Sequence, residues 1–201
     1  MNPFSQGWAH SSQLNANHAP QGAVPSVYGA LPYTPRPLGA PTFLKFTFAS
    51  PDGTVLNGRV VGPGASQSQA TYFAIATDST TSGVSVVQNP QRATVARIEW
   101  RTQAVVEIHD AVSRQRAAQW LVLSADKTYR IMSVRGHSFT WMPQDDYIGL
   151  YTRTPRPQLL GRVSQGQDGA VLEVAAEVVQ MGLLEALVVA ALLLMCGRNI
   201  D

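Results

Sequence analysis

The sequence predicts a mainly β protein, an antiparallel β-barrel that is closed or nearly closed around one hydrophobic C-terminal helix. Many short segments alternate between apolar and polar residues and are separated by Gly, Pro, Asp or Asn. Such regularly spaced short segments are typical of all-β barrels and sandwiches. The segment 181–196 is almost entirely apolar. A helix that is apolar on every side must be buried on every side, and a barrel provides such an enclosure within one chain.

The clearest alternation lies in residues 94–101, where Arg97, Glu99 and Arg101 share one face of the predicted strand. Ile98 and its apolar neighbours share the opposite face, as expected of a half-buried strand. For residues 115–123 a short helix and a strand remain equally compatible with the pattern. Further strands are expected at 42–50, 54–61, 72–77, 84–87, 105–109, 129–134, 137–142, 147–152, 159–163 and 172–174.

The apolar C-terminal segment predicts a central helix over about 175–197. A helix needs roughly 20 predominantly apolar residues to cross a bilayer, and here Glu185 interrupts a shorter run. The polar end of the sequence also disfavours a tail anchor in a membrane. The predicted core residues of the helix are Leu187, Val188, Leu192, Leu194 and the inert thiol Cys196.

Residues 1–40 differ in composition from the rest and predict a disordered or extended N-terminal arm, followed by the barrel domain at 41–201. The arm is rich in Pro, Gly, Ala, Ser, Gln and Asn, and Arg36 is its only formal charge. Segments of this composition lack the apolar surface needed for a packed core. Isolated aromatic residues on such an arm suit a docking segment, although a solubilising tail is the alternative. The candidate docking residues are Trp8, Tyr28, Tyr33 and Arg36.

Composition disfavours nucleic acid as a partner, because the formal net charge is +2 and only 14% of residues are charged. Nucleic-acid-binding domains usually carry a clustered basic face. A single cysteine excludes an intrachain disulfide, and the first residues do not resemble a secretory signal. We therefore expect a cytoplasmic protein, with peripheral membrane association as a further possibility.

Three motifs carry a resemblance to a known group of folds. They are Glu99-Trp100, the segment 138–153 with Phe139-Thr140-Trp141, and the "LLGRV" segment 159–163, followed by the apolar helix. In this order they resemble a fungal domain family of unknown function, related in fold to the tubby, phospholipid-scramblase and LURP-one-related group. The resemblance covers about residue 43 to the end of the sequence. It implies a twelve-stranded barrel around a central helix, and it does not imply a catalytic site.

The sequence offers no combination of residues that points to catalysis, and we expect a protein that is not an enzyme and binds no cofactor or metal. Neither a nucleophile elbow nor a phosphate-binding loop occurs. His109 precedes Asp110, but neighbours on a strand point to opposite faces. His137 lies at an expected turn. Asp145 and the acidic residue after it provide too few ligands for calcium and suit a hairpin turn.

The function favoured by the sequence is a non-enzymatic interaction or scaffold module that binds protein partners or itself, with the N-terminal arm as a tether or docking segment. The alternative is a peripheral membrane module that binds anionic lipid or phosphoinositide headgroups. Basic residues near a membrane surface each contribute about 1 kcal/mol of attraction to anionic lipid. The candidate headgroup contacts are Arg97, Arg101, Arg130 and Arg135.

Overall fold

A computed structural model describes residues 24–25, 32–33, 42–64, 69–78, 83–167 and 169–201. The chain divides into two units, Met1–Ala40 and Pro41–Asp201. In the first unit, the described residues form two short antiparallel strands, β1 (Val24–Pro25) and β2 (Pro32–Tyr33). The remaining described elements all belong to the second unit.

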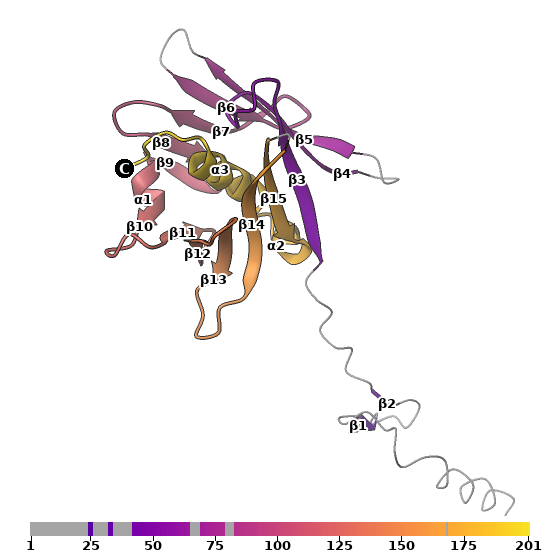
Figure 1. Cartoon of the computed structure of the whole chain (residues 1–201). Coiled ribbons are helices and arrows are strands. Elements are labelled where there is room, and N and C mark those ends of the chain that lie inside the picture. The colour runs from indigo at the N-terminus through magenta and orange to yellow at the C-terminus, as the bar shows by residue number, and fades with distance from the viewer. Residues whose placement is uncertain (1–23, 26–31, 34–41, 65–68, 79–82, 168) are drawn as a thin grey trace, which may run out of the picture. The chain divides into compact units, whose positions relative to one another are not determined.

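The second unit is built on one antiparallel sheet of thirteen strands, which confirms a mainly β fold (Figure 1). All but one pair of neighbouring strands follow each other in the chain, because short turns join them into hairpins. In sheet order the strands are β10 (Leu121–Leu123), β11 (Arg130–Val134), β12 (His137–Pro143), β13 (Ile148–Thr152), β14 (Leu159–Gly166), β15 (Gly169–Ala175), β3 (Phe43–Ala49), β4 (Gly58–Pro63), β5 (Gln69–Asp78), β6 (Val84–Gln88), β7 (Thr94–Glu99), β8 (Val105–Ile108) and β9 (Val112–Arg116).

The one pair of neighbours that is distant in sequence joins β15 to β3, the last and first strands of this unit. In its register Leu172 lies opposite Phe46, and both side chains are fully buried. Apolar residues on one face of each strand thus fix the register, because a shift by one residue would expose them all.

The expected alternation is confirmed on β3 and in part on β7, where Val95 and Glu99 are buried as well. Phe46 and Phe48 are buried on β3, and Ile98 is buried on β7 while Arg97 is exposed. The return strand β4 begins at Gly58, several residues later than expected. The ambiguous segment 115–123 contains both alternatives: it ends β9, forms a one-turn helix α1 (Ala117–Trp120), and continues as β10.

The sheet is open, and its two edge strands are β9 and β10. These strands are consecutive in the chain and are joined by α1. In the described residues no backbone hydrogen-bond ladder pairs β9 with β10. The hydrogen bonding therefore shows an open sheet and not a closed barrel. The sheet also contains thirteen strands, whereas the resemblance implied twelve.

The C-terminal helical region consists of two helices, α2 (Ala176–Gln180) and α3 (Leu184–Met195), whereas the sequence predicted one. Gly182 separates them in the left-handed conformation, with φ of 72°. Its N–H donates to the Val179 carbonyl, and the Leu183 N–H donates to the Val178 carbonyl. This pair of bonds is a Schellman motif, which ends α2 by satisfying its last carbonyl groups.

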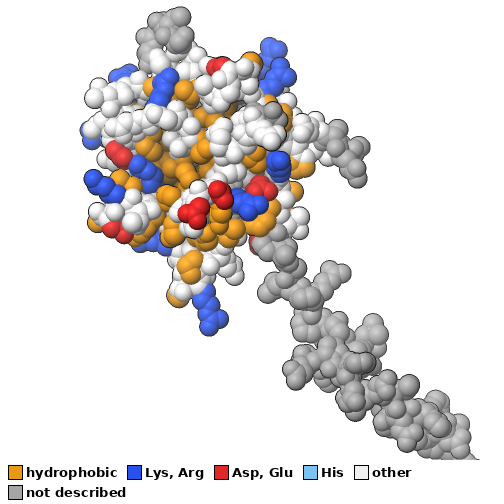
Figure 2. Space-filling model, viewed as in Figure 1, with side chains coloured by type: hydrophobic (Ala, Val, Ile, Leu, Met, Phe, Trp, Pro, Cys, Tyr) orange, Lys and Arg blue, Asp and Glu red, His pale blue; other side chains and the backbone are white. Residues whose placement is uncertain are grey.

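The core surrounds α3, whose side chains are buried from Ala186 through Leu193. The helix contacts β15 and β7, between which four other strands, β3 to β6, lie in the sheet. The sheet therefore curls around the helix. Leu187, Val188 and Leu192 are fully buried as expected, but Leu194 is only half-buried. Figure 2 shows hydrophobic side chains toward the middle of one face, with Lys and Arg mainly around its rim.

We expect Gly182→Ala to lower the free energy of unfolding by about 1–2 kcal/mol. A side chain in the left-handed conformation costs about that much, and the added Cβ would lie 2.7 Å from Nη1 of Arg135. The check is urea unfolding followed by circular dichroism. Met181→Ala is the matched control, because Met181 is exposed and adopts a right-handed conformation. Equal stability of the two variants would contradict the role given to Gly182.

Candidate functional site

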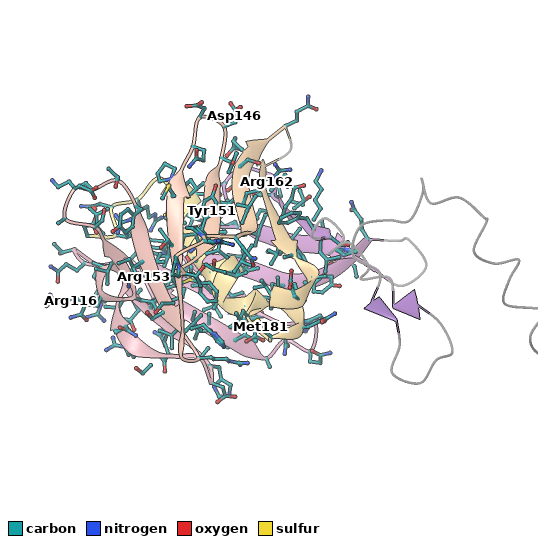
Figure 3. All side chains as sticks on the ribbon, turned by 90° about the horizontal axis from the view of Figure 1, so that it is seen from below. Arg116, Asp146, Tyr151, Arg153, Arg162 and Met181 are labelled. Carbon is teal, nitrogen blue, oxygen red and sulfur yellow. The ribbon has the colours of Figure 1, made fainter. Side chains whose placement is uncertain are left out.

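The candidate site lies on the outer face of β7, β8 and β9, at one end of the sheet. Inward residues of β7 such as Ile98 are buried, so the alternating Arg97 and Glu99 belong to the outer face. In the ladder, Arg97 lies opposite Glu107 on β8, and Glu99 lies opposite Val105. Val105 in turn lies opposite Arg116 on β9. Figure 3 shows Arg116 projecting outward from the edge of the unit.

Glu99 is held by three arginines on this face. Nη2 of Arg114 donates a hydrogen bond to Oε2 of Glu99 at 2.9 Å. Nη2 of Arg101 lies 3.2 Å from the same oxygen, and Nε of Arg97 lies 3.7 Å from Oε1. The side chain of Glu99 is only 10% exposed, whereas those of the three arginines are 55–68% exposed. The carboxylate is therefore covered by the arginines, which still present guanidinium groups to solvent.

These contacts lower the pKa of Glu99 below its ordinary value. The hydrogen bond from Arg114 is the largest cause, and the charges of Arg114, Arg101 and Arg97 add to it. Burial acts in the opposite direction, because it disfavours the charged carboxylate. Glu99 is therefore ionised at neutral pH and fixes the arginines in place.

The arginines leave this face with an excess of positive charge. Arg97, Arg101, Arg114 and Arg116 contribute four positive charges, and Glu99 with Glu107 contributes two negative ones. The difference of +2 equals the formal net charge of the whole chain. This excess of positive charge can attract an anionic partner to this face. We call these four arginines with Glu99 and Glu107 the arginine face.

A hollow of about 210 Å³ adjoins the arginine face and is lined in part by Thr94, Arg97, Glu107 and His109. Nε2 of His109 lies 3.3 Å from Oδ2 of Asp110, with both side chains more than three quarters exposed. The expectation that these neighbours point to opposite faces is wrong, because Asp110 lies in the β8–β9 turn with φ of 55°. Among the described residues, Asp110 is the polar side chain that contacts the imidazole of His109. Thr94 and His109 both line the hollow, but no hydrogen bond joins the Thr94 hydroxyl to His109 in the described part of the chain.

The other two predicted headgroup contacts lie elsewhere. The guanidinium of Arg130 donates to both carboxylate oxygens of Asp201 and to the Leu121 carbonyl, and its side chain is only 16% exposed. Arg135 lies in the β11–β12 turn, beside Gly182. The structure therefore brings together Arg97 and Arg101 but not all four arginines.

The sequence prediction missed Arg114 and Arg116. Both alternate with other residues on β9, so their period-two spacing was the available signal. The segment 115–123, for which the sequence left a short helix and a strand open, began too late to include Arg114. The β8–β9 ladder contains a bulge between two of its residue pairs, Val106 with Gln115 and Ile108 with Val112. A register shift of this kind re-aims side chains and is invisible in sequence.

Several other candidates have ordinary structural partners or lie outside the described residues. Asp145 and Asp146 belong to the β12–β13 turn, where Gln144 N–H donates to the Tyr147 carbonyl, and Figure 3 shows Asp146 at its tip. In the described residues no group of acidic, His and Cys side chains suits a metal ion. The side chain of Tyr33 in β2 is not described. Three docking candidates lie outside the described residues: Trp8, Tyr28 and Arg36.

Cys196 is half-buried at the end of α3 rather than enclosed in the core. Its thiol donates a hydrogen bond to the Leu193 carbonyl at 3.2 Å. Partial burial raises the pKa of this thiol, because a thiolate is poorly solvated there. A raised pKa lowers its reactivity as a nucleophile.

No protein-family model, curated protein or solved structure matches the chain. Within the described residues, no helix combines the length and the apolar character that crossing a membrane requires.

We expect Glu99→Gln to lower the free energy of unfolding at pH 7 and to weaken its dependence on pH below about 5. Because folding lowers the pKa of Glu99, the unfolded state binds more protons in the interval between the two pKa values. The stabilisation is fully present at a pH above the pKa of Glu99 in the unfolded state, which is about 4.3. It is lost as the pH falls through the lower pKa of Glu99 in the folded state. Urea unfolding of both proteins from about pH 2.5 to 7 measures this difference.

A matched control is Glu107→Gln, which removes an exposed carboxylate from the same face. The hypothesis requires the wild type and Glu99→Gln to converge in stability at the lowest pH. A difference that stays constant across the whole range would contradict it.

Proposed function

We propose that the protein is a non-enzymatic interaction module built on a tubby-like barrel, which binds an acidic segment of a protein partner through the arginine face. The observation that carries the proposal is the clamping of Glu99 by three arginines with two net positive charges left over. An arginine-bound carboxylate already occupies this face, so carboxylates of a partner match its chemistry.

The geometry of the arginines supports the binding of carboxylates. A guanidinium presents several N–H donors in a fixed fork that matches a carboxylate. Glu99 uses only part of the donor capacity of Arg97, Arg101 and Arg114, whose side chains remain more than half exposed. Because Glu99 also holds them in position, less conformational entropy is lost when a partner binds.

A barrel is supported by the strand order around the buried helix. The sheet curls from β15 to β7 around α3, and its edge strands β9 and β10 are joined by a single helical turn. Backbone pairing between these two edges would complete the closure. The proposed tubby-like relationship rests on this arrangement and on the Glu99-Trp100 and Phe139-Thr140-Trp141 motifs.

Anionic lipid headgroups are a second candidate ligand of the same face. Arg97 and Arg101, two of the residues expected to contact headgroups, project from one strand end and are exposed. In this case the protein is a peripheral membrane module, and each basic residue contributes about 1 kcal/mol of attraction.

We expect the wild type to bind a fluorescein-labelled peptide of alternating Glu and Asp, as measured by fluorescence anisotropy at low salt. Arg97→Gln combined with Arg101→Gln should weaken this binding by about tenfold, because two charge-assisted contacts are lost. Arg114 remains to neutralise Glu99 in this variant. The matched control is Arg59→Gln with Arg156→Gln, which removes the same charge from exposed positions elsewhere.

Co-sedimentation with phosphatidylcholine vesicles that contain phosphatidylserine or a phosphoinositide separates the two candidates. Binding of vesicles without binding of the peptide would favour the membrane module. Equal loss in both double variants would show general charge attraction and overturn the assignment to the arginine face. A turnover activity that a single polar substitution abolishes would overturn the non-enzymatic proposal itself.

A further inference from the structure

The open edge of β9 lies directly beside the arginine face. β9 ends the sheet, and β8 and α1 are the described elements that pack along it. An edge strand leaves one row of backbone N–H and C=O groups unpaired, and such a row can pair with an extended segment of another chain. Which backbone groups of β9 face the free side follows from its ladder with β8.

Alternate residues of β9 direct their backbone groups to the free side. The N–H of Ala117, directly after the strand, donates to the Ala104 carbonyl at 2.8 Å. In an antiparallel ladder, residues bonded to the neighbouring strand alternate with residues whose groups point away from it. Counting back, Gln115 bonds toward β8, whereas Arg114 and Arg116 point away. In the described residues no hydrogen bond occupies the backbone N–H or C=O of Arg114.

Arg116 adds its N–H to this free row. It is the N-cap residue of α1, and the carbonyl of an N-cap residue accepts the first hydrogen bond of its helix. The free row therefore consists of the N–H and C=O of Arg114 and the N–H of Arg116. Both residues are exposed and belong to the arginine face. A strand paired there would bring its own outward side chains beside their guanidinium groups.

The opposite edge of the sheet, at β10, is less available. The N–H of Leu121 donates to the Ala117 carbonyl, and the carbonyl of Leu121 accepts from Nη1 of Arg130 at 2.9 Å. The three residues of β10 also carry no charged side chain. This edge is thus partly occupied and has nothing that selects for an acidic segment.

We propose that an acidic segment of a protein partner binds β9 as an added antiparallel strand. The inference rests on the proposed function of the arginine face and specifies how a partner uses it. The antiparallel direction continues the pairing of β7, β8 and β9. One partner residue exchanges two hydrogen bonds with Arg114, and the residue two positions before it accepts the N–H of Arg116.

This register defines the chemistry of the partner. The two partner residues opposite Arg114 and Arg116 share the outer face with them, because side chains directly opposite each other lie on the same side of a sheet. Carboxylates at these positions meet guanidinium groups. The segment therefore carries Glu or Asp at alternate positions. A second copy of this chain is a poor occupant, because its β9 would place arginines against arginines.

Two N-methylated peptides of the same composition and charge test the pairing. A fluorescein-labelled peptide of alternating Glu and Thr should bind the full chain at low salt, as measured by fluorescence anisotropy. In the antiparallel register the Glu N–H groups face β9, so N-methylation of the Glu residues should weaken binding by about tenfold. N-methylation of the Thr residues is the matched control and should leave binding unchanged, because those groups face away from β9.

Amide hydrogen exchange of the ¹⁵N-labelled full chain locates the pairing on the protein. The unmodified peptide should slow exchange at the N–H groups of Arg114 and Arg116, because both become hydrogen-bonded. The N–H of Gln115 bonds toward β8 with or without peptide and is the internal control.

Equal binding of the two methylated peptides, without added protection at Arg114, would overturn strand addition and leave the arginine face as a charged docking surface. Weaker binding of the Thr-methylated peptide alone would contradict the antiparallel direction. If the unmodified peptide does not bind at low salt, the proposed function fails, and the inference fails with it. The failure of the inference is thus distinguishable from that of the function on which it rests.

Discussion

The burial of α3 is the constraint on which the rest of the structure depends. From Ala186 to Leu193 every side chain of this helix is buried, so no side of it faces water. Burying a Leu or Val side chain contributes about 1.5–3 kcal/mol, and that gain requires cover on all sides. The thirteen-stranded sheet provides the cover by curling until β15 and β7 both contact the helix.

Enclosure of the helix also separates two chemical environments on the same strands. Residues on the inner face, such as Phe46 and Ile98, are drawn into the core. Their neighbours on the outer face are free to be charged, which is why Arg97 and Glu99 lie outside. Glu99 is nevertheless nearly covered, because the long stems of the arginines lie over it. Interactions there are stronger than those of fully exposed ion pairs.

The arginine face is exposed to solvent, so its attraction for an anion is long-ranged and weakened by salt. A face of this kind suits an extended acidic surface.

The sequence by itself determined the mainly β class, most strand positions and the burial of the helix centre, because these depend on local alternation and on apolar content. It also identified Arg97 and Arg101 as neighbours on one face. It did not identify Arg114 as the partner of Glu99, nor Asp201 as the partner of Arg130, since these pairs join segments distant in the chain. The open edge between β9 and β10 was likewise decided by tertiary structure, and so was the indole of Trp141, which is unpaired among the described residues. Each depends on which strands and helices surround a residue, and that arrangement exists only after the sheet has curled around α3.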